Sequence, residues 1–99
     1  MSFKYAHNFV TLYYKGQEVK IDEKLAPIIQ QCWELGIKTR HCCQGHTMKR
    51  GMERLGYIQF EEEKDAHKFM ELLSNKVTEA HLFDTKEGRQ WPVVRFNPL

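Results

Sequence analysis

Residues 41–46 read HCCQGH, so two imidazoles and two thiols lie within six positions of one another, interrupted by a glycine. Side chains of these types can bind a metal ion, or supply a nucleophile together with its base. A glycine in such a segment can also shape a turn whose backbone N–H groups bind an anion. Each of the three chemistries makes a different demand on the rest of the chain.

A metal site receives little support from the spacing. Structural zinc sites usually draw their ligands from two separated places, and this chain has no second Cys/His cluster. If Cys42 and Cys43 lie on a strand, their side chains point to opposite faces, so that only His41, Cys43 and His46 could converge. We therefore expect no metal ion and no other cofactor.

Covalent catalysis is the second possibility. Cys43 precedes the glycine turn and is flanked by Arg40, His41 and His46, and positive neighbours lower the pKa of a thiol. His46 could act as the base. The sequence assigns no Asp or Asn that would orient either histidine. An enzyme acting on a nucleotide or RNA through Cys43 and His46 is thus the alternative prediction, and a binding protein is favoured over an enzyme.

The third possibility is a turn that binds an anion. Gly45 permits positive φ and a close approach of the backbone to a ligand. Gln44 offers both a donor and an acceptor, and His46 offers a switchable donor. Thr39 and Arg40 precede this turn on the same predicted strand.

The next predicted strand adds an aromatic ring to this turn. Tyr57 and Gln59 alternate with Ile58 and Phe60. If the apolar pair faces the core, Tyr57 lies on the open face and could stack on a base. The predicted ligand-binding residues are Thr39, Arg40, Cys43, Gln44, Gly45, His46, Arg54, Tyr57 and Gln59.

Positive charge is concentrated around this motif. The whole chain has a net charge of +2, which alone is too small to indicate nucleic-acid binding. Residues 38–54, however, hold five basic side chains (Lys38, Arg40, Lys49, Arg50 and Arg54) against the single acid Glu53. A local basic field attracts anions. We therefore predict a small anionic, nucleotide-derived ligand, with nucleic acid as a less favoured partner.

The elements that must position these residues follow the order ββαββαββ. Residues 8–14 and 18–21 predict a hairpin, residues 37–42 and 55–60 two further strands, and residues 77–83 and 91–96 a last hairpin. Helical periodicity covers residues 24–35, with Asp22 as the expected N-cap and Gly36 at the C-terminal end, and again residues 61–75. This order predicts a single-domain α+β two-layer sandwich over residues 1–99, with both helices on one face of a mostly antiparallel sheet. The other face is free or is covered by a second copy. We expect a homodimer or a larger homo-oligomer, because the sequence leaves several apolar and aromatic residues that could pack against a symmetric partner, namely Phe9, Tyr13, Trp91 and Phe96.

Composition sets the broad class. The chain has 99 residues, of which 41% are hydrophobic and 28% charged, as is typical of a globular domain. No run of about 18 apolar residues is present, so we expect no contact with a membrane. The first residues lack the apolar stretch of a secretion signal, and three cysteines are an odd number. Reduced thiols and a cytoplasmic location are therefore expected.

A longer stretch of the chain resembles a group of small, largely uncharacterised proteins of bacteria and their phages. The stretch GQEVKIDEKLAPIIQQCWELGIKTRHCCQGH, followed by YIQF, carries their order of W-x-L-G-I-x-T, S-C-Q-G and Y-I-x-F. The similarity covers residues 16–74. Thr39, Cys43, Gln44 and Gly45 match the pattern, whereas Cys42 replaces its usual serine. The resemblance implies an anti-defence protein that sequesters a signalling nucleotide in the host cytoplasm, or an inhibitor that docks its basic loop on an acidic host protein.

A shorter segment, T-x-x-C-C-Q-G-H, is similar to the S-x-S-C-S-G-R segment of the wybutosine-synthesis tRNA methyltransferases. This similarity implies an adenosine-type ligand, and it adds S-adenosylmethionine to the enzyme alternative. No G-x-G-x-x-G loop follows a predicted strand, so we expect no Rossmann-type cofactor site.

Overall fold

Hydrogen bonding divides the strands into two antiparallel sheets in the computed structural model, which describes residues 8–45, 54–87 and 90–99. The small sheet is a hairpin of β1 (Phe9–Tyr14) and β2 (Gln17–Asp22). The larger sheet has the order β3-β4-β6-β5 and consists of β3 (Thr39–Cys43), β4 (Gly56–Phe60), β5 (His81–Phe83) and β6 (Val93–Phe96). The helices are α1 (Ala26–Glu34) and α2 (Glu63–Leu72), with 3-10 turns η1 (Ser74–Lys76) and η2 (Thr85–Glu87). The α+β class and the predicted element order are confirmed, but two sheets take the place of one.

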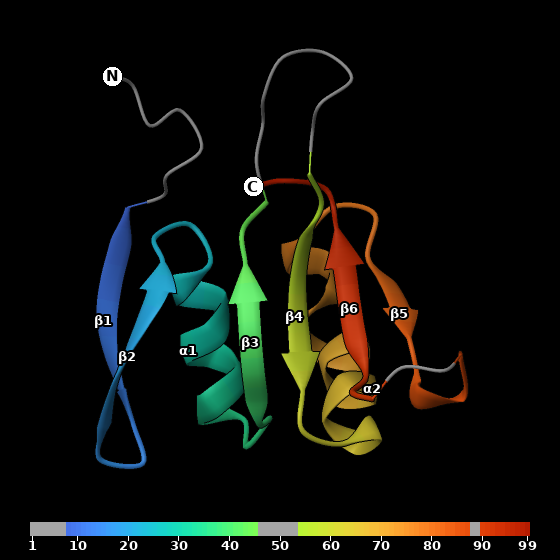
Figure 1. Cartoon of the computed structure of the whole chain (residues 1–99), viewed down its shortest axis with the longest axis horizontal. Coiled ribbons are helices and arrows are strands. Elements are labelled where there is room, and N and C mark those ends of the chain that lie inside the picture. Colours follow the sequence, from blue (N-terminus) through green and yellow to red (C-terminus); the bar gives the residue numbers. More distant parts are fainter. Residues whose placement is uncertain (1–7, 46–53, 88–89) are drawn as a thin grey trace.

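Both helices lie on the same side of the strands, behind them in Figure 1. The core fills the space between helices and strands. Ile58 and Phe60 of β4 have no exposed surface, and Phe69 of α2 packs on Phe60 with ring centroids 5.4 Å apart. Ile58 and Phe60 thus face the core, which is the condition under which Tyr57 was expected on the open face. Among the residues that the structure describes, no helix lies on the other side of the larger sheet, which carries Tyr57 and Gln59.

The start of α1 differs from the expectation. Asp22 is not its N-cap, because β2 continues to Asp22 and the cap position belongs to Leu25, which has no side-chain capping bond. Pro27 therefore falls in the first turn, where its missing N–H costs nothing. The predicted end is confirmed. Gly36 has φ +78°, and the N–H of Ile37 donates to the carbonyl of Cys32 at 2.8 Å, which closes the helix.

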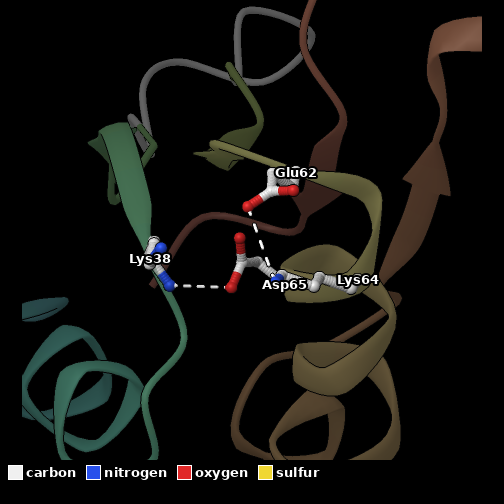
Figure 2. Close-up of polar contacts among 4 residues, drawn as sticks. All are labelled: Lys38, Glu62, Lys64 and Asp65. Carbon is white, nitrogen blue, oxygen red and sulfur yellow. Dashed lines mark hydrogen bonds and ion pairs between the residues drawn. The ribbon is translucent and has the colours of Figure 1, made fainter.

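A buried carboxylate fixes α2 against the segment that leads into β3. Asp65 lies in the first turn of α2, where a negative charge is favoured by the helix dipole. Its Oδ1 accepts the backbone N–H of Lys38 at 3.1 Å, as Figure 2 shows. This bond sets where β3 begins relative to the helix layer. Within the described part of the chain, no helix is long and apolar enough to cross a lipid bilayer.

Candidate functional site

A change of register in β3 determines which way the cysteines point. Thr39 pairs with Phe60, but Cys42 pairs with Ile58, so β3 contains one extra residue between these two pairs. Cys42 consequently lies on the core side and packs against the buried cluster. Cys43 lies on the opposite side, in register with Tyr57 of β4. The expectation that the two thiols face opposite sides of the strand is confirmed.

Gln44 and Gly45 build the turn beneath the site rather than line it. Gln44 is buried, and its N–H donates to Asp22 Oδ2 at 3.0 Å. Its side-chain Oε1 accepts the N–H of Lys24 at 2.9 Å, and its carbonyl accepts the N–H of Leu99 at 2.9 Å. These bonds connect the β1–β2 hairpin, β3 and the C-terminal residues.

Gly45 has φ +88°, as expected for a glycine in a turn. A Cβ at Gly45 would lie 2.8 Å from the carbonyl oxygen of Arg54, 2.8 Å from the nitrogen of Gly56 and 2.9 Å from the Cα of Pro98. The close approach that this glycine allows is therefore one between segments of the protein's own backbone. The sequence-based expectation placed a ligand in that space.

A pocket of about 470 Å³ opens beside this turn. Its lining residues are Cys43, Arg54, Leu55, Tyr57 and Arg95. Cys43, Tyr57 and Arg95 stand in register on β3, β4 and β6, which explains why they share one face. The volume falls in the range of sites for small organic ligands.

The pocket lining is positive and otherwise neutral. Arg54 and Arg95 contribute two guanidinium groups, and none of the described residues that line the pocket is acidic. Burial raises the pKa of the Tyr57 phenol, an effect that the nearby Cys43 adds to and Arg95 opposes. The phenol therefore stays protonated and can donate a hydrogen bond. A guanidinium binds the oxygens of a phosphate or carboxylate through two parallel hydrogen bonds.

The Cys43 thiol is also protonated at neutral pH. Burial raises its pKa, the backbone N–H of Gly45 lowers it, and the carboxylate of Asp22 raises it further. For Cys42, burial is again the main cause, and the pKa rises to about 12. The sequence suggested that positive neighbours would lower the pKa of Cys43. The pKa is instead raised, by burial and by the carboxylate of Asp22.

The remaining predicted site residues lie outside the pocket lining. Thr39 faces α1, where its Oγ1 accepts the Nε1–H of Trp33 at 3.0 Å. Arg40 lies over the ring of Trp91, with its Cζ 3.8 Å from the ring centroid. Gln59 is half-buried on the open face of β4. His46 lies outside the described residues, as do Lys49 and Arg50.

Sequence reasoning missed Arg95 and Leu55. A signal for Arg95 exists in the strand VVRF, since Val94 and Phe96 alternate with it and are buried. The same alternation placed Tyr57 on the open face. The pairing of β4 with β6, which brings Arg95 beside Tyr57, is not encoded in either strand alone.

In the described part of the chain, no three His, Cys, Asp or Glu side chains are grouped so that they could hold a metal ion. No protein-family model, curated protein or solved structure matches the chain.

Proposed function

We propose that the protein binds a small anionic, nucleotide-like ligand in the pocket of Arg54, Tyr57 and Arg95, and sequesters it without chemical turnover. The observation that supports this proposal is the pairing of two guanidinium groups with an aromatic ring in one pocket. The arginines would bind phosphate oxygens, and the face of the tyrosine ring would stack on the base.

The protonation state of Cys43 favours ligand binding over covalent catalysis. A nucleophilic cysteine reacts as its thiolate, and such cysteines have lowered pKa values. The raised pKa of Cys43 leaves a neutral thiol in the pocket wall. Cys43→Ser should therefore leave the affinity almost unchanged. Loss of a measurable turnover in this variant would instead favour the enzyme alternative.

Isothermal titration calorimetry with nucleoside monophosphates tests the proposal, with inorganic phosphate as the comparison. Arg95→Ala removes one charge-assisted hydrogen-bonding group, and such a bond contributes about 1.5–3 kcal/mol. The affinity should then fall about tenfold to a hundredfold. Lys76→Ala is the matched control, because Lys76 is an exposed cation in η1 and does not line the pocket.

Two outcomes would contradict the proposal. One is an unchanged affinity in a folded Arg95→Ala protein. The other is a nucleotide whose mass has changed when it is recovered after heat denaturation, because sequestration returns the ligand intact. Phosphate should bind more weakly than a nucleotide, since it offers no ring to Tyr57.

A further inference from the structure

A second planar, cationic surface lies on the same face of the larger sheet as the pocket. Arg40 is exposed and its guanidinium lies over the half-buried ring of Trp91, 3.8 Å from the centroid. Thr39 points toward α1, so the neighbouring Arg40 points to the side without helices. The cation–π contact holds the guanidinium against the ring. The exposed Arg40 and the ring together offer a platform on which a nucleic-acid base can stack.

The platform and the pocket lie at opposite ends of β4. Tyr57 and Arg95 are opposite one another at the pocket end. From this pair toward the other end of β4, Gln59 lies two residues farther along and is opposite Val93. Trp91 lies two residues beyond Val93 in the same direction, and so four residues from Arg95. At about 3.3 Å per residue, the platform lies roughly 13 Å from the pocket. Stacked nucleotides advance about 3.4 Å each, so about four of them would span this distance.

The face is suited to a polyanion. Arg40, Arg54 and Arg95 are distributed along it, and none of them has an ion-pair partner among the residues that the structure describes. An acidic protein would also be attracted by these charges, but it would make no use of the Arg40–Trp91 cation–π pair. Unpaired bases use such a surface, whereas a duplex hides its base faces.

We propose that this face binds a single-stranded oligonucleotide, with one nucleotide in the pocket and a later base stacked on the Arg40–Trp91 platform. The inference rests on the proposed function for the nucleotide in the pocket and adds a second subsite to it. It goes beyond a mononucleotide ligand because the platform lies too far from the pocket for one base to occupy both.

Fluorescence titration with 5′-phosphorylated oligothymidylates of one, two, four and eight nucleotides tests the inference, with oligouridylates as the RNA comparison. The protein has two tryptophans, and Trp33 is stacked on Tyr14 with ring centroids 4.4 Å apart. In a Trp33→Phe protein, Trp91 reports alone. Its emission should be quenched by the tetranucleotide and not by the mononucleotide. Affinity should rise up to about four nucleotides and then level off.

Substitutions on the platform separate the two proposals. Arg40→Ala, at an exposed position, and Trp91→Ala should each weaken the tetranucleotide about tenfold and leave mononucleotide affinity unchanged. Equal affinity for one and four nucleotides, without an effect of either substitution, would overturn the second subsite and leave the pocket proposal standing. Tetranucleotide binding that depends on Trp91 but not on Arg95 would overturn the pocket proposal instead. Equally tight binding of poly-glutamate would exclude nucleic acid as the specific occupant.

Discussion

Cys43 combines accessibility to the pocket with surroundings that oppose ionisation. Burial raises the pKa of its thiol above the ordinary value of 9.0, and the carboxylate of Asp22 adds to this increase. We expect iodoacetamide to alkylate Cys43 slowly at pH 7.5, and the rate to keep rising with pH beyond 9, because only the thiolate reacts. Peptide mass spectrometry over a pH series gives the rate. The denatured protein is the control, and it should react faster at pH 7.5.

A nucleotide bound in the pocket should slow this alkylation further, since Cys43 lines the wall. A rate that levels off below pH 8 would contradict the assignment of a neutral thiol. It would restore the possibility that Cys43 is a nucleophile.

At Gly45 the backbone leaves no room for a side chain. Gly45→Ala would place a Cβ 2.8 Å from two backbone atoms of the strand entry at Arg54–Gly56, at a φ of +88°. We expect a loss of about 3 kcal/mol or more in the free energy of unfolding, from backbone strain and forced displacement together. Denaturation in urea measures this loss.

Gly16→Ala is the matched control for Gly45→Ala. Gly16 has φ +77°, but nothing lies within 4 Å of its added Cβ. Gly16→Ala should lower the free energy of unfolding only by the cost of holding alanine at a positive φ, about 1 kcal/mol. Equal losses in the two variants would mean that the packing around Gly45 can relax.

At the level of elements, β3 is held by side chains from outside its own sheet. Asp22, the last residue of β2, accepts the N–H of Gln44 at 3.0 Å, and both residues are buried. Asp22→Ala leaves that N–H unsatisfied, which should lower the free energy of unfolding by about 1–3 kcal/mol. Glu23→Ala changes an exposed acid at the next position and should stay within about 0.5 kcal/mol of the wild type. Similar losses in both variants would contradict a specific role for the Asp22–Gln44 bond.

The same contact shows where sequence reasoning reaches its limit. Periodicity and turn residues predicted both helices, their order among the strands and the Gly36 end of α1. Local patterns assigned Asp22 to a helix cap and Gln44 to a ligand. Both side chains instead join segments that lie about 20 residues apart. Asp22 could have capped a helix and Gln44 could have bound a ligand within their own segments. The local sequence therefore gives no indication that their partners lie about 20 residues away.

The bulge in β3 has a comparable effect on the site. A strand without it would have put Cys42 on the side of Arg40, by simple alternation. The extra residue between Thr39 and Cys42 returns Cys42 to the core and places Cys43 beside Tyr57. Alternation therefore predicted the opposite orientations of the two cysteines, whereas cross-strand register decided which of them reached the pocket.

At the scale of the whole molecule, the open side has two distinct parts. The larger sheet presents the arginines, Tyr57 and the Arg40–Trp91 platform. The β1–β2 hairpin presents Phe9 and Tyr13, which are 60% and 69% exposed. Phe96, which the sequence offered as a possible interface residue, is 1% exposed and belongs to the core. Among the described residues, the two most exposed large apolar side chains are therefore both on β1.

We predict that two copies associate through β1. Among the described residues, β1 pairs only with β2, so its outer edge has free backbone groups next to two exposed aromatic side chains. Light scattering at micromolar concentration should give twice the monomer mass of 11.8 kDa. Tyr13→Lys places a charge in this surface and should shift the protein to the monomer.

Leu72→Lys, which replaces a 44% exposed leucine on α2, should leave the dimer intact. A wild-type protein that is monomeric under these conditions would refute the association. A dimer broken by Leu72→Lys but not by Tyr13→Lys would place the interface on the helix layer. Association through β1 leaves the larger sheet uncovered, so the Tyr13→Lys monomer should bind mononucleotides as tightly as the dimer does.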